Sequence, residues 1–294
     1  MTTIRSIKVA ILLTVLSLSP LDILAADDSS TPTEGIDEQW LKTLVSIEVV
    51  PGVGDPQAIG SGFLIATTNK HNILVTAKHV VVDDKGQPIT NLAYRFNQKS
   101  GNAVLVTEDH MARYAQTWFY STDADVACRF IVFSDNFDIK ALTEDLFLSW
   151  PQLKPGANVL IPGFPLGIRS PEHADPIVRR GIVARASSND IVLDAFVFPG
   201  NSGGPVIYVP TLKFSGDIIK IPFINRERFI GLVSGSISYV DTAISQQTRR
   251  PRVTFEENSG LCNIVSAQSI AALLNREDVK KHDSIPDLKI QPSE

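Results

Sequence analysis

The sequence has little cysteine and no concentration of positive charge. Two cysteines among 294 residues exclude a small fold held by several disulfides and a zinc site built from four thiolates. Lysine and arginine number 27 against 32 aspartates and glutamates, which gives a formal charge of −5, and no basic block stands out. Phosphate binding needs a positive surface. We therefore expect no nucleic-acid partner.

The first apolar run is too short to span a membrane. Arg5 and Lys8 precede the ten-residue run Val9–Leu18, and the small pair Ala25–Ala26 follows it. A membrane-spanning helix needs about 20 apolar residues, whereas a basic start, a short apolar run and small residues are typical of a secretory signal peptide. We predict a signal peptide over residues 1–26, export to the periplasm or the outside of the cell, and no stable membrane insertion after cleavage.

The rest of the chain has the pattern of a turn-rich β protein. Eighteen glycines and 18 prolines separate short runs rich in valine, isoleucine and phenylalanine, a composition that would break the helices of a bundle. Strands do not alternate with helices, and no internal repeat is visible. The predicted strands are 44–50, 61–67, 72–81, 103–107 and 126–133, then 158–161, 177–184, 191–197, 205–209, 218–224, 229–237 and 252–255.

These strands form two groups, separated by a stretch around residues 150–156 that contains tryptophan and proline. The grouping predicts an all-β fold of two consecutive antiparallel β-barrels, the first at about 40–150 and the second at about 151–265. Ser266 can cap a C-terminal helix at about 266–275, because three apolar residues recur there at helical spacing.

The two ends of the mature chain are polar. Residues 27–39 contain one isolated apolar side chain and predict a flexible leader, since they cannot bury enough surface to order themselves. Charges are crowded into residues 276–294, which predicts a mobile tail.

The most informative stretch is Gly200–Pro205, which reads Gly-Asn-Ser-Gly-Gly-Pro. Glycines beside Ser202 permit unusual backbone torsion angles, and neighbouring N–H groups can converge on a developing oxyanion. An ordinary glycine-rich hairpin would account for these residues as well. The stretch also matches the Gly-x-Ser-x-Gly elbow of α/β-hydrolases, which place their histidine after the serine and follow the serine with a helix. Here only His282 comes later, and residues 205–209 read as a strand.

A serine nucleophile needs a base, and His79 is the best candidate. It lies near the end of the apolar run at residues 73–81, where a strand edge presents side chains to a cleft. The other histidines that precede the serine, His71, His110 and His173, lie in polar, turn-like settings.

The base in turn needs a group that orients it. Asp125 begins a strand that soon becomes apolar, which suits a half-buried carboxylate. Asp123, two residues earlier, and Asp194, in the same local segment as Ser202, remain competitors for this role.

Three stretches therefore occur in the order histidine, aspartate, serine: Thr76–Val81, Asp125–Ala127 and Gly200–Pro205. Together they resemble the active-site blocks of the chymotrypsin-like serine peptidases, particularly the bacterial trypsin-like, HtrA-type branch. Supporting blocks at 60–65, 161–167, 181–183, 231–236 and 259–265 extend the resemblance over residues 40–275. Two departures stand out: we expect no PDZ module after the helix, and an added hairpin within residues 206–230.

The resemblance implies a serine endopeptidase that acts on polypeptides through an acyl-enzyme. Ser202 would be the nucleophile, His79 the general base and then acid, and Asp125 the carboxylate that fixes the tautomer of His79. The backbone N–H groups of Gly200 and Ser202 would form the oxyanion hole. Ser234 resembles the position that bonds the orienting aspartate and pairs with substrate backbone. The implied substrate-binding residues are Phe196, Val197, Ser234, Gly235 and Ser236.

Two other functions stay open. A catalytically silent two-barrel binding protein would have no need of the three residues together, and an esterase would use the same nucleophile. Large apolar residues at the implied pocket predict cleavage after small or medium apolar residues, because an unpaired cation would be costly to bury there. An active role of Asp194 would instead favour basic residues.

No metal or cofactor is expected, because histidines and carboxylates do not cluster at metal-ligand spacing. The oligomeric state stays open. Export would favour a disulfide between Cys128 and Cys262, whereas the apolar strand around Cys128 would suit a free thiol.

Overall fold

The structure is a computed structural model. It describes residues 35–112, 118–133, 135–170, 172–188, 190–211, 213–215, 218–220, 224 and 226–285. The predicted signal peptide, the leader up to residue 34 and the end of the chain from residue 286 lie outside the described residues. Within the described ranges, no helix is long and apolar enough to cross a membrane.

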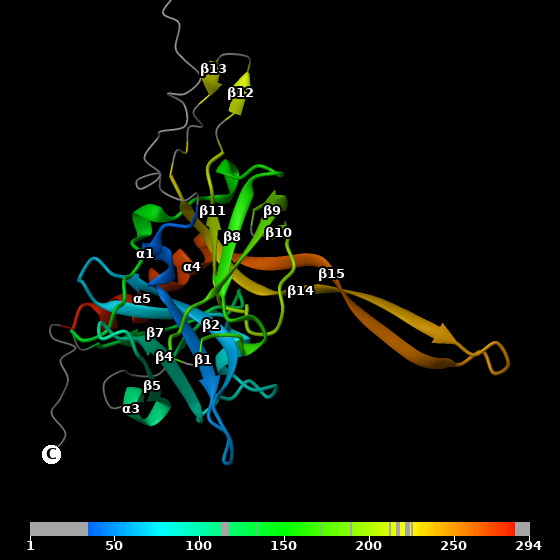
Figure 1. Cartoon of the computed structure of the whole chain (residues 1–294), viewed down its shortest axis with the longest axis horizontal. Coiled ribbons are helices and arrows are strands. Elements are labelled where there is room, and N and C mark those ends of the chain that lie inside the picture. The colour runs from blue at the N-terminus through cyan, green and yellow to red at the C-terminus, as the bar shows by residue number, and fades with distance from the viewer. Residues whose placement is uncertain are drawn as a thin grey trace, which may run out of the picture. The chain divides into compact units, whose positions relative to one another are not determined.

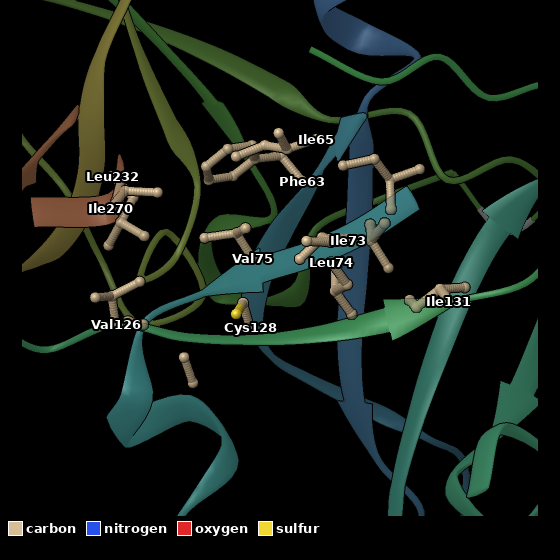
Figure 2. Packing of buried hydrophobic residues seen from close by; sticks show 14 of the residues in the cluster. Phe63, Ile65, Ile73, Leu74, Val75, Val126, Cys128, Ile131, Leu232 and Ile270 are labelled. Atoms are coloured by element: carbon tan, nitrogen blue, oxygen red, sulfur yellow. The ribbon is translucent and has the colours of Figure 1, made fainter. Parts of the chain in front are cut away.

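The first half of the chain forms a seven-stranded antiparallel sheet, blue to green in Figure 1, with the order β5-β4-β1-β2-β3-β7-β6. Its buried face carries valine, leucine, isoleucine and phenylalanine side chains, and Figure 2 shows Phe63, Val75 and Cys128 among them. The strands are β1 Leu44–Val49, β2 Gln57–Ala66, β3 Asn72–Thr76, β4 Leu92–Asn97, β5 Ala103–Thr107, β6 Phe119–Tyr120 and β7 Ala127–Ile131.

The second half closes into a six-stranded barrel with the order β10-β15-β14-β11-β8-β9. The strands are β8 Asn158–Gly163, β9 Ile177–Ser187, β10 Asp190–Asp194, β11 Pro205–Tyr208, β14 Arg228–Ile244 and β15 Pro251–Ser266. Leu232 of β14 reaches the first core, where Figure 2 shows it beside Ile270. Two consecutive antiparallel β units followed by a helix confirm the predicted fold class.

The added hairpin expected within residues 206–230 is present. Strands β12 Lys213–Ser215 and β13 Ile218–Lys220 form a separate two-stranded antiparallel sheet, in which Phe214 lies opposite Ile219.

The two ends of the described chain are more ordered than the sequence suggested. Helix α1 Glu38–Leu41 begins inside the predicted leader, because Asp37 caps it and Trp40 is fully buried. Helix α4 Ala267–Leu274 has the predicted cap: Ser266 Oγ accepts a hydrogen bond from the Ser269 N–H at 3.1 Å.

The prediction of a mobile tail from residue 276 is wrong for its first part. Residues Glu277–Asp283 form helix α5, with acidic residues in its first turn and basic residues in its last, as the helix dipole favours. Val279 is 1% exposed and belongs to the first core. Asp283 accepts hydrogen bonds from Thr67 Oγ1 at 2.7 Å and from His71 Nδ1 at 2.9 Å. The sequence did not predict this helix, because Val279 is its one residue in the hydrophobic core and stands among charged residues.

Strands β14 and β15 continue far beyond the barrel. From the Ser238–Asn258 pair outward they pair with each other up to Ile244 and Pro251, and Figure 1 shows this ribbon extending from the barrel. The sequence predicted only 229–237 and 252–255 as strands, so most of this extension was not expected. We refer to residues 238–258 as the ribbon.

The two cysteines lie in different cores. Cys128 on β7 belongs to the core of the first sheet, and Cys262 on β15 to the core of the barrel. Both are buried and free of a disulfide. Burial raises the pKa of each thiol to about 12, so the thiols act as small apolar side chains.

Candidate active site

The position of His79 follows from the end of strand β3. The strand stops at Thr76, and helix α2, Lys78–Val81, begins after Ala77, so the predicted strand over 72–81 is shorter than expected. Val80 and Val81 are 3% and 0% exposed and anchor this single helical turn. His79 is left at the surface, with its side chain 50% exposed.

Asp125 reaches His79 because β7 pairs with β3, with Ala127 opposite Thr76. This register places the segment before β7 beside the start of α2. Asp125 Oδ1 accepts a hydrogen bond from the His79 backbone N–H at 3.1 Å, and Oδ2 lies 2.7 Å from His79 Nδ1. Ser234 Oγ donates to the same Oδ2 at 2.7 Å. The carboxylate therefore holds both the backbone and the ring of His79.

These contacts also determine the charge of Asp125. Burial raises the pKa of this carboxyl, but the hydrogen bonds from His79 and Ser234 outweigh it, and the pKa lies below its ordinary value. An ionised carboxylate only accepts hydrogen bonds, so Nδ1 of a neutral His79 carries the ring proton. The lone pair is then on Nε2, which is the nitrogen a general base would use.

The competing aspartates do not contact His79 in the described structure. Asp123 Oδ1 accepts a hydrogen bond from Thr122 Oγ1 at 3.1 Å, and its N–H donates to Ser121 Oγ at 3.3 Å. Asp194 is exposed at the end of β10.

The other histidines lie elsewhere. His71 bonds Asp283, and the His282 ring packs 4.6 Å from the Phe130 ring. His110 is on helix α3, Glu108–Ala112, and His173 lies in the segment before β9.

Ser202 lies on the loop between β10 and β11, and two glycines shape that loop. Gly200 and Gly203 have φ angles of +98° and +83°, in the left-handed region that favours glycine. A Cβ at Gly200 would collide with the Phe164 carbonyl, and one at Gly203 with the Ser61 carbonyl. The glycines in this motif are therefore required for the loop to lie against its neighbours.

Ser61 on β2 connects this loop to the first sheet. Its N–H donates to the Ser202 carbonyl at 2.8 Å, and its Oγ donates to the Gly200 carbonyl at 2.6 Å. The same Oγ accepts from the Phe164 N–H at 3.0 Å. Ser61 lies in the 60–65 block, but the sequence assigned it no role. The position of its hydroxyl between Gly60 and Gly62 was the one sequence feature that could have indicated this contact.

The nucleophile candidate and the base candidate are not hydrogen-bonded to each other in the described structure. Ser202 Oγ donates instead to the Ser234 carbonyl at 3.2 Å. Catalytic hydrogen bonds are often unmade without substrate. Within the described ranges, the N–H groups of Gly200 and Ser202 have no acceptor, whereas the N–H groups of Asn201 and Gly203 donate to Phe198 and Val233 carbonyls at 2.9 and 2.8 Å.

The predicted substrate-binding residues are divided between surface and core. Phe196 is 52% exposed, Ser236 is exposed, and Ser234 and Gly235 are half-buried. Val197 is 2% exposed and packs in the barrel core, so the prediction that its side chain lines a pocket wall is wrong. Side chains alternate between the two faces of an extended chain, and Val197 shares the inward face with Ala195.

The described residues contain no group of three or more histidine, cysteine or carboxylate side chains placed to hold a metal ion.

Two antiparallel β units, with a histidine–aspartate pair on the first and a glycine-flanked serine on the second, define the chymotrypsin-like architecture. The family model of the trypsin-like peptidase domain matches residues 60–210, slightly more than half of the chain. The chain belongs to this family.

Comparison with individual proteins adds little. No curated protein matches the chain significantly. Among solved structures, the HtrA-type protease AlgW with a tripeptide matches with a TM-score of 0.47 and 16% identity. The match covers 83% of this chain and 62% of that protein, so the chain spans less than two thirds of its length.

Proposed function

We propose that the protein is an exported serine endopeptidase that hydrolyses peptide bonds through an acyl-enzyme. The observation that carries this proposal is the set of contacts of the Asp125 carboxylate. It bonds the backbone N–H and Nδ1 of His79 and the hydroxyl of Ser234. The backbone carbonyl of Ser234 in turn accepts a hydrogen bond from the Ser202 hydroxyl. In this proposal the peptidase unit covers residues 40–275, with one barrel on each side of residue 150.

The first step is activation of Ser202. The Ser234 carbonyl that holds Ser202 Oγ is also a suitable acceptor for a substrate backbone N–H. A bound substrate takes over this acceptor, and Ser202 Oγ rotates toward His79 Nε2. The exchange replaces one hydrogen bond with another of similar strength, so it costs little. Substrate binding thereby completes the triad.

Chemistry then follows the acyl-transfer pattern. Ser202 Oγ attacks the substrate carbonyl carbon while His79 Nε2 takes the hydroxyl proton. The N–H groups of Gly200 and Ser202 bind the resulting oxyanion, a role supported by their lack of acceptors in the described structure. The imidazolium, stabilised by Asp125, protonates the leaving amine. Water activated by His79 then hydrolyses the ester on Ser202.

We further propose a polypeptide substrate cleaved after small or medium apolar residues. Asp194 is exposed at the end of β10, and Phe196 presents an apolar ring to the surface. An arginine or lysine side chain placed against such an apolar wall would lose hydration without gaining a partner.

Two experiments test the function. A fluorophosphonate probe labels an activated serine, so the wild type should be labelled and the Ser202→Ala variant should not. Absence of labelling in the wild type would favour a catalytically silent binding protein. A peptide-library digest then separates a peptidase from an esterase, and cleavage mainly after arginine or lysine would contradict the proposed substrate preference and implicate Asp194.

A further inference from the structure

The ribbon carries several large apolar side chains that are exposed to solvent. Tyr239, Val240, Ile244, Val253 and Phe255 are each between 52% and 60% exposed. A two-stranded hairpin alone is only marginally stable in water. Exposed apolar side chains grouped on one element indicate an interaction surface.

The register assigns these side chains to the two faces of the ribbon. Residues directly opposite each other on antiparallel strands share a face. Tyr239 lies opposite Glu257, Asp241 opposite Phe255, and Ala243 opposite Val253, so these six residues form one face, called here the aromatic face. Val240 and Ile244 belong to the other face, where Thr242 and Thr254 also lie opposite each other.

Charge is separated along the ribbon. Its only charged residues are three arginines, 249, 250 and 252, near the tip, and three carboxylates, Asp241, Glu256 and Glu257, nearer the barrel. All six are exposed, and no ion pair joins any of them within the described residues. The ribbon is therefore neutral in total but positive at one end and negative at the other.

We propose that the ribbon is a dimerisation arm that binds the ribbon of a second copy of this chain. Two copies packed antiparallel through their aromatic faces bring the basic tip of each against the acidic base of the other. A two-fold axis requires this self-complementarity, because each residue contact then occurs twice.

The spacing suits such an axis. An axis near the Ala243–Val253 pair has Arg249 and Arg250 on one side and Asp241 and Glu257 on the other, between two and four residues along the strands, or roughly 7–13 Å, away. Val253 then meets its symmetry mate at the centre, and Tyr239 and Phe255, on the barrel side of the axis, pack against the tip side of the partner ribbon. Burial of these side chains supplies the affinity, and the charges select the antiparallel orientation.

Sedimentation of the full chain tests the proposal with two charge-reversal variants. The wild type should sediment at twice the mass of one chain. Arg249→Glu/Arg250→Glu gives a ribbon that is acidic at both ends apart from Arg252, and Asp241→Lys/Glu257→Lys gives one that is basic at both ends apart from Glu256. Each variant alone should dimerise about 100-fold more weakly, because like charges then meet at both ends of the interface.

An equimolar mixture of the two variants should dimerise again, since acidic and basic ribbons complement each other at both ends. This mixture also separates the proposal from misfolding, because a misfolded variant would not be rescued. A monomeric wild type, variants that still dimerise, or a mixture that stays monomeric would each overturn the proposal.

The face is tested by a matched pair of variants. Tyr239→Ser/Phe255→Ser removes apolar side chains from the aromatic face and should weaken the dimer. Val240→Ser/Ile244→Ser removes a similar exposed apolar surface from the other face and should leave it intact. The reverse result would contradict the assignment of the face.

Discussion

His79 and Asp125 come from adjoining segments of the first sheet, whereas Ser202 comes from a loop of the second barrel. The β3–β7 ladder holds the first pair, and the contacts from His79 to Asp125 are already made at 2.7 and 3.1 Å. The Ser202 loop depends on contacts with other segments, above all Ser61. The His79–Asp125 pair, which carries the proposed base, is therefore already assembled, whereas Ser202, the proposed nucleophile, does not yet contact His79 in the described structure.

This difference indicates how the His79–Asp125 pair and the Ser202 loop should respond to substitution. Substitution of side chains that take part in proton transfer should lower kcat most, whether they lie in the His79–Asp125 pair or in the Ser202 loop. Orienting and loop-positioning residues should matter less, because chemistry can proceed at a reduced rate when geometry is only loosened.

The largest effect should come from Ser202→Ala and His79→Ala. Loss of either residue from such a triad costs up to about a millionfold in kcat. Ser202 Oγ makes one hydrogen bond within the described residues and the His79 side chain is half exposed, so thermal unfolding should barely change. Hydrolysis of a peptide and the melting temperature are the two measurements. Substantial activity in Ser202→Ala would remove it from the nucleophile role.

Asp125→Asn should be next, with a loss of up to about 10⁴-fold in kcat. An asparagine can donate to Nδ1 and so stabilise the wrong tautomer of His79. Asp123→Asn is the matched control, because Asp123 contacts Thr122 and Ser121 instead. If Asp123→Asn proved inactivating and Asp125→Asn silent, the orienting role would belong to Asp123.

Ser61→Ala should lower kcat by about 10- to 100-fold. The change removes the Oγ bonds to Gly200 and Phe164 and leaves a buried N–H without a partner, at a cost of about 1–3 kcal/mol. Ser46→Ala is a close control: Ser46 is also buried and lies opposite Ser61 on β1, but its Oγ bonds Glu48. Equal kcat losses in both variants would show that Ser61 has no special role in positioning the loop.

The smallest effect concerns pH. Only a neutral imidazole can accept the Ser202 proton. Once the pH is low enough to protonate the imidazole, kcat/KM should fall about tenfold for each further unit by which the pH is lowered. Hydrogen bonds hold the pKa of Asp125 below its ordinary value, so this carboxylate stays ionised in mild acid and keeps its contacts with His79. A profile that is flat from acid to neutral pH would argue against a histidine base.

The sequence predicted the parts of the fold that periodicity and local motifs specify. Both groups of strands and the capped helix α4 are local features. Strand β4 was missed because Arg95 and Asn97 interrupt its apolar pattern, although Arg95 lies in the sheet by pairing with the buried Glu48. Helix α5 was missed because its one core residue, Val279, stands among charges.

The candidate site divides in the same way. His79, Asp125 and Ser202 stand in recognisable stretches, so their identities were predictable. The roles of Ser61 in the loop contact and of the Ser234 carbonyl as acceptor for Ser202 depend on the meeting of distant segments. The inward orientation of Val197 depends on the register of one strand, which a one-residue shift would reverse.

The central claim is that the His79–Asp125 pair activates Ser202. The rate at which a fluorophosphonate modifies Ser202, followed by intact mass and located by peptide mapping, tests it most directly. We predict rapid modification of Ser202 alone in the wild type and in Asp123→Asn, and a loss of several orders of magnitude in His79→Ala and Asp125→Asn. Modification at the same rate in all four proteins, or at a different serine, would contradict the account.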